Sequence, residues 1–136
     1  MKVSIITPDR IAYEGEADSL TIPTSMGEVG ILPGHVPLLT TIEAGNLEAV
    51  LGGKTELLVV ADGFAEVVGD QITILTDEAI DIAAIDPEEV EKARERAKAE
   101  LEAAVDQNID PAEIERLQGS YRYALARQLA KGRKRY

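Results

Sequence analysis

The first 84 residues alternate short apolar runs with turn residues, with roughly eight to ten residues between turns. Six runs rich in β-branched residues stand at residues 3–7, 19–23, 47–51, 56–60, 64–68 and 71–75. The pair Gly52-Gly53 between two of the later runs is typical of a hairpin turn, and Asp62-Gly63 and Gly69-Asp70 are expected to turn the chain again. Many short strands without a helical period predict an antiparallel β-sandwich or flattened barrel.

The pattern changes after Ala84. Asp86-Pro87-Glu88-Glu89 places an N-cap residue, a proline at the first helical position and a glutamate three residues after the cap, and Asp110-Pro111-Ala112-Glu113 repeats the arrangement. These signals predict helices over 87–105 and 111–133. Because the connection between them is short, we expect an antiparallel αα-hairpin.

Each predicted helix carries one apolar stripe. The first stripe is Val90, Ala93, Ala97, Leu101 and Ala104, and the second is Ile114, Leu117, Tyr121, Ala124 and Leu125, ending at Gln128. Alanine buries little area, so the hairpin must lean on the β-domain or on another protein. The sequence therefore predicts an α+β chain with a β-sandwich domain over 1–85 and a hairpin over 86–136. A permanently docked helical cap and an exchange between two docked states both remain open.

Charge is unevenly distributed along the chain, whose formal net charge is −11. Residues 1–85 hold three basic and 14 acidic residues, whereas residues 116–136 hold seven basic residues and no acid. Nucleic acid and anionic lipid repel a chain this acidic, and we therefore expect neither as a partner. The N-terminus shows no signal peptide and no apolar run of spanning length, which predicts a cytoplasmic protein without membrane insertion.

The residue inventory excludes several kinds of chemistry. The absence of cysteine excludes disulfides, thiolate metal sites and a cysteine nucleophile, and a single histidine argues against a His-based metal site or catalytic triad. We expect His35 to hydrogen-bond within its own loop. The carboxylates of Glu14, Glu16 and Asp18 are expected to share one solvated strand face.

The densest unusual stretch is GEVGILPGHVPLLT at residues 27–40. Its glycines and prolines predict a rigid loop with an apolar tip at Ile31-Leu32 and a charge at Glu28. We expect Gly30 and Gly34 to adopt positive φ. The stretch lacks the Gly-Lys-Ser/Thr of a phosphate-binding loop and the context of a dinucleotide fold, and so favours protein contact.

This stretch, followed by Ile42-Glu43-Ala44-Gly45 and later by Gly63-Phe64-Ala65-Glu66-Val67, resembles the epsilon subunit of the bacterial-type F1Fo ATP synthase. The resemblance covers the whole chain. It implies a ten-stranded β-sandwich followed by an αα-hairpin, in agreement with the pattern.

The resemblance also implies a function. Epsilon subunits are non-catalytic parts of the rotor, form the central stalk with the gamma subunit, and lie against the c-subunit ring at the cytoplasmic face of the cell inner membrane. A flank of the sandwich would bind gamma. The residues implied to face the c ring are Glu28, Gly30, Ile31, Leu32, Gly34 and His35.

In bacterial relatives the hairpin can extend along gamma towards the alpha and beta subunits and block ATP hydrolysis at an acidic segment of beta. The bases that would serve this role here are Arg116, Arg122, Arg127, Lys131, Arg133, Lys134 and Arg135.

Some relatives bind ATP through an Ile/Leu-Asp-x-x-Arg-Ala motif that opens the first helix. Here Ile85 and Asp86 match it, but Glu89 replaces the arginine and Val90 the alanine. A carboxylate at that position repels phosphate, so the departure argues against ATP as a regulatory ligand. Asp86 and Arg122 are the candidate residues if ATP does bind, and no cofactor or metal is expected.

Three alternatives stand beside this interpretation. One is the mitochondrial counterpart of the same subunit, which would normally carry an Arg- and Ser-rich presequence. Another is a small β-sandwich binding module with a dimerising hairpin. A small hydrolytic enzyme is disfavoured by the absence of cysteine and the single histidine.

Overall fold

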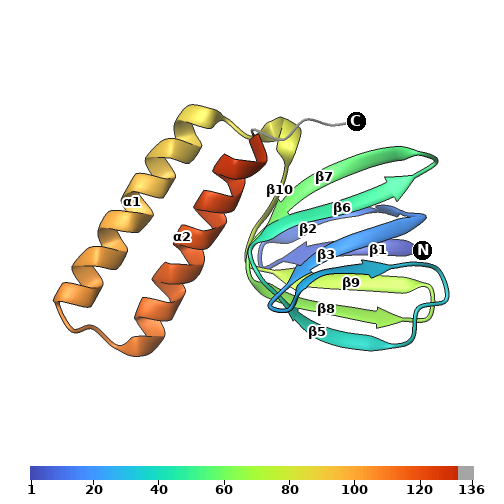
Figure 1. The fold of residues 1–136 in the computed structure, drawn as a ribbon, viewed down its shortest axis with the longest axis horizontal. Coiled ribbons are helices and arrows are strands. Elements are labelled where there is room, and N and C mark those ends of the chain that lie inside the picture. Colours follow the sequence, from blue (N-terminus) through green and yellow to red (C-terminus); the bar gives the residue numbers. More distant parts are fainter. Residues whose placement is uncertain (132–136) are drawn as a thin grey trace.

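The computed structural model describes residues 1–131 as ten strands followed by two helices (Figure 1). The strands are β1 (Lys2–Thr7), β2 (Arg10–Glu16), β3 (Ser19–Thr24), β4 (Gly27–Ile31), β5 (Leu38–Ile42), β6 (Gly45–Leu51), β7 (Lys54–Val60), β8 (Gly63–Val68), β9 (Gln71–Thr76) and β10 (Ala79–Asp81). A 3-10 turn, Ile82–Ala84, leads to α1 (Pro87–Asp106) and α2 (Pro111–Lys131). The predicted β-sandwich followed by a helical hairpin is confirmed.

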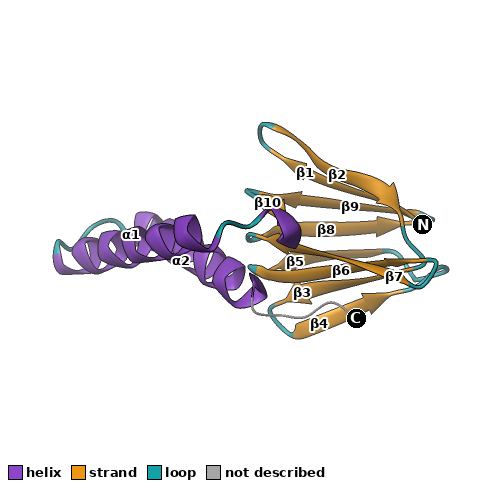
Figure 2. Cartoon of the chain, turned by 90° about the horizontal axis from the view of Figure 1, so that it is seen from above, coloured by secondary structure: helices purple, strands orange, loops and turns teal. Residues whose placement is uncertain are grey.

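The strands form two five-stranded sheets (Figure 2). Sheet 1 has the order β2-β1-β9-β8-β5, and sheet 2 has the order β10-β7-β6-β3-β4. All neighbouring strands are antiparallel except β1 and β9, which pair in parallel. This one pair departs from the antiparallel pattern, because β1 and β9 are joined by no hairpin and their relative direction depends on the whole chain path.

The sandwich has a core of its own between the two sheets. Strand alternation directs one set of side chains inward, and Ile5, Ile22, Leu47, Ile72 and Ile74 are completely buried there. The cluster extends from Val3 to Ala79 and includes no helical residue. The β-half is therefore packed independently of the hairpin.

The two helices begin where the sequence predicts. The Asp86 carboxylate accepts a hydrogen bond from the Glu88 backbone N–H at 3.0 Å, and Asp110 accepts one from Ala112 at 2.9 Å. Asn108 adopts a φ of 57° in the short connection, which lets α2 return antiparallel to α1. The αα-hairpin is thus confirmed.

α2 lies between α1 and the sandwich (Figure 1). Its Tyr123 and Ala130 pack with Leu57 and Val59 of β7 and with Ile82 of the 3-10 turn. These residues form a second apolar cluster, separate from the sandwich core. In this structure the hairpin therefore packs against the sandwich, which is one of the two partners, the β-domain or another protein, that its alanine-rich stripe was expected to need.

We expect residues 1–85 to fold without the hairpin, because the sandwich core ends at Ala79. The fragment exposes Leu57 and Val59, so its urea midpoint should fall below that of the full chain. Its unfolding should still be one cooperative transition by circular dichroism. A fragment that lacks a cooperative transition would show that the sandwich depends on the hairpin.

Candidate functional site

The glycine-rich stretch does not form one loop. Residues Gly27–Ile31 are strand β4 at the edge of sheet 2, and Leu38–Ile42 are strand β5 at the edge of sheet 1. Within this stretch, only residues 32–37 lie outside strands; we call them the crossover loop, because they lead from sheet 2 to sheet 1. Ile31 is completely buried, so its predicted place in an exposed tip is wrong: alternation along β4 turns it into the core.

The exposed residues of the stretch consequently lie in two separate places, near the start of β4 and in the crossover loop. Glu28 pairs with Pro23 near the start of β4 and lies about 13 Å along the strand from Leu32. Leu32 and Val36 are 61% and 70% exposed in the crossover loop, where Gly34 also lies. The crossover loop and Glu28 therefore approach opposite ends of β4.

Local contacts fix the shape of the crossover loop. The His35 backbone N–H donates to the Leu32 carbonyl at 3.1 Å, and the ring Nδ1 donates to the Val36 carbonyl at 2.6 Å. Gly34 has a φ of 84°, as predicted, whereas Gly30 lies in β4 and has no positive φ. The loop hydrogen bond expected of His35 is confirmed, and the positive φ expected of Gly30 is wrong because that residue belongs to a regular strand.

Three basic residues of α2 contact a partner in the docked hairpin: Arg116, Arg122 and Arg127. Arg116 pairs with Glu113 one turn earlier, its Nε lying 3.2 Å from both carboxylate oxygens. Arg122 Nη2 lies 2.5 Å from Asp62 Oδ2, across the boundary between hairpin and sandwich.

Arg127 stacks on the ring of Tyr123, its guanidinium carbon 4.6 Å from the ring centroid. Lys131 ends α2, and Arg133, Lys134 and Arg135 lie outside the described residues. While the hairpin is docked, Arg122 is therefore paired with Asp62 and Arg127 is stacked on Tyr123.

Asp62 is the polar centre of the contact between hairpin and sandwich. Its Oδ1 accepts the Ala44 backbone N–H at 2.9 Å while Oδ2 accepts Arg122. A Cβ on Gly119 would lie 3.2 Å from the same carboxylate, so α2 approaches Asp62 closely at that glycine. Sequence reasoning missed this contact, since residues 62 and 122 are joined only by the tertiary fold.

The candidate ATP residues do not come together. Asp86 caps α1, beside the last turn of α2, and Arg122 stands nine residues before Lys131. At the helical rise this separation is about 13 Å along the axis. Val90, at the motif's alanine position, is buried between the hairpin and the sandwich.

The remaining polar residues show structural roles. Glu14, Glu16 and Asp18 are exposed, and Asp18 accepts the Gly52 backbone N–H at 2.8 Å.

Within residues 1–131, no group of three or more His, Asp or Glu side chains could hold a metal ion. Burial raises the pKa of Tyr123 to about 12, so this phenol stays neutral at physiological pH. No helix within the same residues is long and apolar enough to cross a bilayer.

Sheet 1 carries an apolar row on its outer face. The strand registers align Phe64 with Leu75, Leu75 with Ile6, and Ile6 with Ile11, across four neighbouring strands. Phe64 is 54% exposed, Leu75 50% and Ile11 61%. Neighbouring large apolar side chains on one exposed face mark a surface for protein contact. In the sequence, this surface is indicated by apolar residues at the outward-facing positions of both β8 and β9.

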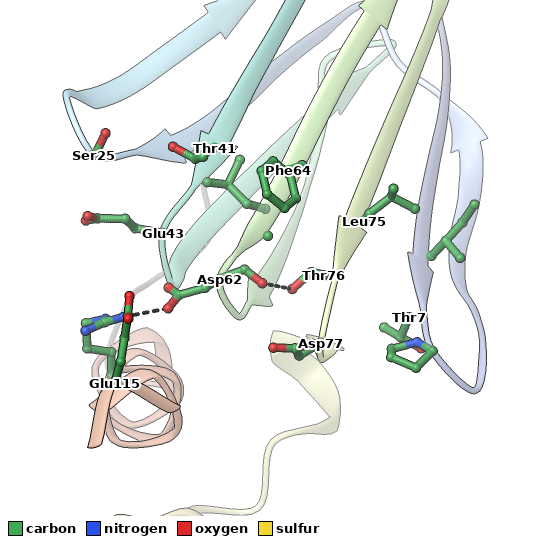
Figure 3. A pocket seen from close by; sticks show the side chains of 15 residues that line it. Thr7, Ser25, Thr41, Glu43, Asp62, Phe64, Leu75, Thr76, Asp77 and Glu115 are labelled. Atoms are coloured by element: carbon green, nitrogen blue, oxygen red, sulfur yellow. Dashed lines mark hydrogen bonds and ion pairs between the residues drawn. The ribbon is translucent and has the colours of Figure 1, made fainter. Parts of the chain in front are cut away.

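A groove of about 710 Å³ lies where this row meets α2 (Figure 3). Phe64 and Leu75 line it on the sheet side, and Glu115 and Arg122 line it on the α2 side. Glu43 and Asp77 add two further carboxylates from strand ends. The groove thus combines an apolar wall with acidic groups and is built from both halves of the chain.

Comparison with known proteins gives consistent matches. Residues 1–82 match the family model described as the ATP synthase delta/epsilon chain, β-sandwich domain. The ATP synthase epsilon chain of Halalkalibacterium halodurans is 40% identical over 110 residues, which cover 81% of this chain and 83% of that protein. The ATP synthase epsilon chain of Bacillus subtilis is 37% identical over 106 residues, covering 78% and 80%.

A solved structure extends the match to the hairpin. A chain in the OSCP/F1/c-ring structure of the Euglena gracilis mitochondrial ATP synthase aligns with a TM-score of 0.72 and 28% identity. The alignment covers 94% of the present chain and 79% of that chain.

Proposed function

The chain belongs to the delta/epsilon-chain family of ATP synthases, and from this premise we propose that it is a non-catalytic central-stalk subunit of a proton-translocating F1Fo ATP synthase. The observation that carries the proposal is the match to epsilon chains over about four fifths of both proteins. The subunit would couple proton flow to ATP synthesis as part of the rotor, peripheral to the cytoplasmic face of the cell inner membrane.

Two surfaces would serve as rotor contacts. We assign the gamma subunit to the outer face of sheet 1, because the row Ile11–Ile6–Leu75–Phe64 is the kind of exposed apolar surface that a permanent partner covers. We assign the c-subunit ring to the crossover loop, where Leu32, Gly34 and His35 lie in a rigid turn. Glu28 and Gly30 would be reached along the free edge of β4, whereas Ile31 supports the strand from within.

The hairpin would regulate hydrolysis by leaving its docked position. Arg122 is paired with Asp62, and Arg127 is stacked on Tyr123, so both become available to another acidic surface only after undocking. We propose that the extended hairpin then presents the basic end of α2 to the alpha and beta subunits. The ion pair is partly exposed and contributes about 1 kcal/mol or less, so a competing acidic surface can offset it.

We expect a Gly34→Val variant to impair coupling. A β-branched residue at a φ of 84° costs on the order of 1–2 kcal/mol locally, and no atom lies within 4 Å of the new Cβ, so the sandwich itself should stay folded. The measurement is proton-driven ATP synthesis in membrane vesicles that contain ATP synthase stripped of this subunit. Wild-type chain should restore synthesis, and the variant should restore less than about half of it.

The matched control is Gly27→Val, which places the same side chain at a φ of 106° at the first residue of β4, again with open space around the Cβ. This variant should restore synthesis as the wild type does. If the wild-type chain does not restore synthesis, the rotor assignment is wrong. If it does and Gly34→Val restores synthesis equally well, the crossover loop is not a rotor contact.

A further inference from the structure

The groove between sheet 1 and α2 has an unbalanced charge. Arg122 and Asp62 neutralise each other on its wall, which leaves the carboxylates of Glu43, Asp77 and Glu115. Within residues 1–131, these three carboxylates take part in neither an ion pair nor a side-chain hydrogen bond. Three negative charges therefore surround an apolar wall that exposes half of Phe64 and half of Leu75.

This combination selects the chemistry of an occupant. Apolar side chains would cover Phe64 and Leu75, and lysine or arginine side chains would meet the three carboxylates. Charges beside a low-dielectric wall focus the field on the space between them, which favours a cation there over a neutral polar group. The fitting occupant is a peptide segment whose apolar residues are flanked by basic ones.

The position of the groove indicates where the segment comes from. The apolar row on sheet 1 runs from Ile11 through Ile6 and Leu75 to Phe64, and its last two residues line the groove. A protein that covers the row reaches the groove without a break. The groove is thus a continuation of the surface that we assigned to the rotor partner.

We propose that the groove receives a basic, apolar segment of the partner that covers sheet 1, and that this segment holds the hairpin docked. The proposal rests on the proposed function and names the regulation of the same contact. Glu43, Phe64, Leu75 and Asp77 belong to the sandwich, whereas Glu115 and Arg122 belong to α2. A segment that contacts both sides binds only the docked state, so its binding free energy is added to the stability of that state.

The first test measures affinity with a matched charge control. The groove variant carries Glu43→Gln, Asp77→Asn and Glu115→Gln. The control variant carries Glu91→Gln, Glu95→Gln and Glu102→Gln, three exposed residues of α1, and so has the same net charge. Each full chain is titrated against the alpha–beta–gamma core of the same ATP synthase, purified without this subunit, at low and at high ionic strength.

We expect the control to bind the core like the wild type. The groove variant should bind about tenfold more weakly at low ionic strength, which corresponds to about 0.5 kcal/mol for each lost pair, and the difference should shrink in high salt. Equal binding by the two variants would overturn the proposal. Failure of the wild-type chain to bind would overturn the proposed function itself.

The second test follows the hairpin. Because the chain has no cysteine, Lys54→Cys and Ala103→Cys give one dye site on the sandwich and one on α1 without background labelling. In the presence of the core, the docked fraction measured by energy transfer should be higher in the wild-type background than in the groove variant, since both meet the same alpha and beta surfaces. Equal docked fractions in the two backgrounds would contradict the proposed coupling. A changed oligomeric state of the isolated groove variant in sedimentation would assign the groove to a second copy instead, and the proposal would be wrong.

Discussion

Replacing Gly63 with alanine should destabilise the sandwich by about 3 kcal/mol or more. A Cβ on this residue would overlap the Leu75 carbonyl oxygen and lie 2.9 Å from Thr76 Cα, both in the neighbouring strand. Both contacts are with backbone, so no side-chain rotation relieves them, and β8 must move away from β9. Since β8 and β9 are in the middle of sheet 1, the shift disturbs the core as well. The measurement is the urea midpoint by circular dichroism.

Gly30→Ala is the matched control for this prediction. Gly30 also lies in a strand, but no atom lies within 4 Å of its added Cβ and its φ is not positive. Its free energy of unfolding, derived from the urea midpoint, should stay within about 0.5 kcal/mol of the wild-type value, because alanine there also reduces the freedom of the unfolded chain. Equal midpoints for the two variants would contradict the close packing of β8 and β9 at Gly63.

The parts of the fold that local sequence determines were predictable. Asp86 with Pro87, and Asp110 with Pro111, mark helix starts. The aspartate cap accepts a hydrogen bond from a backbone N–H of the first turn, and proline has no N–H there that needs a partner. Pairs such as Gly52-Gly53 mark hairpin turns for the same reason, as φ is positive at both glycines. These signals need no information from distant segments.

The docking of the hairpin was only partly predictable. Leu57–Val60 is an uninterrupted apolar run, which is the pattern of a strand buried on both faces. In the structure, Leu58 and Val60 enter the sandwich core, and Leu57 and Val59 meet α2. The sequence reasoning gave α2 one apolar stripe, but Tyr123 and Ala130 form a second buried surface because this helix lies between α1 and the sandwich.

The groove could not be predicted from the sequence. Its lining comes from five strand ends or turns and from α2, and only the completed sheet order brings them together. The parallel pairing of β1 with β9 is of the same kind, since it joins segments about 70 residues apart. The misplaced Ile31 has a simpler cause. Glycine and proline beside it indicated a loop, while the register of β4 directs the side chain inward.

Reversing the charge of the basic residues that follow α2 in the sequence should release ATP hydrolysis in the assembled complex. Residues 116–136 carry seven basic residues and no acid in a chain of net charge −11, so this end is attracted to any acidic surface of a partner. The variant changes Arg133, Lys134 and Arg135 to Glu. Arg122 and Arg127 are left intact, because their contacts with Asp62 and Tyr123 support the docked state and would alter a second equilibrium.

The expected result is a rise of up to about tenfold in the ATPase rate at low ionic strength, since three exposed pairs are together worth about 1–2 kcal/mol. The rise should shrink in high salt because these pairs are screened. Proton-driven synthesis should change little, as forward rotation does not pass through the blocked state.

The control variant changes Lys92, Arg96 and Lys98, three exposed basic residues of α1, to Glu and should leave the rate of ATP hydrolysis unchanged. Arg94 is excluded from it because its Nε is buried. If the variant hydrolyses ATP at the wild-type rate in low salt, the basic end does not inhibit through charge, and the result favours the permanently docked cap.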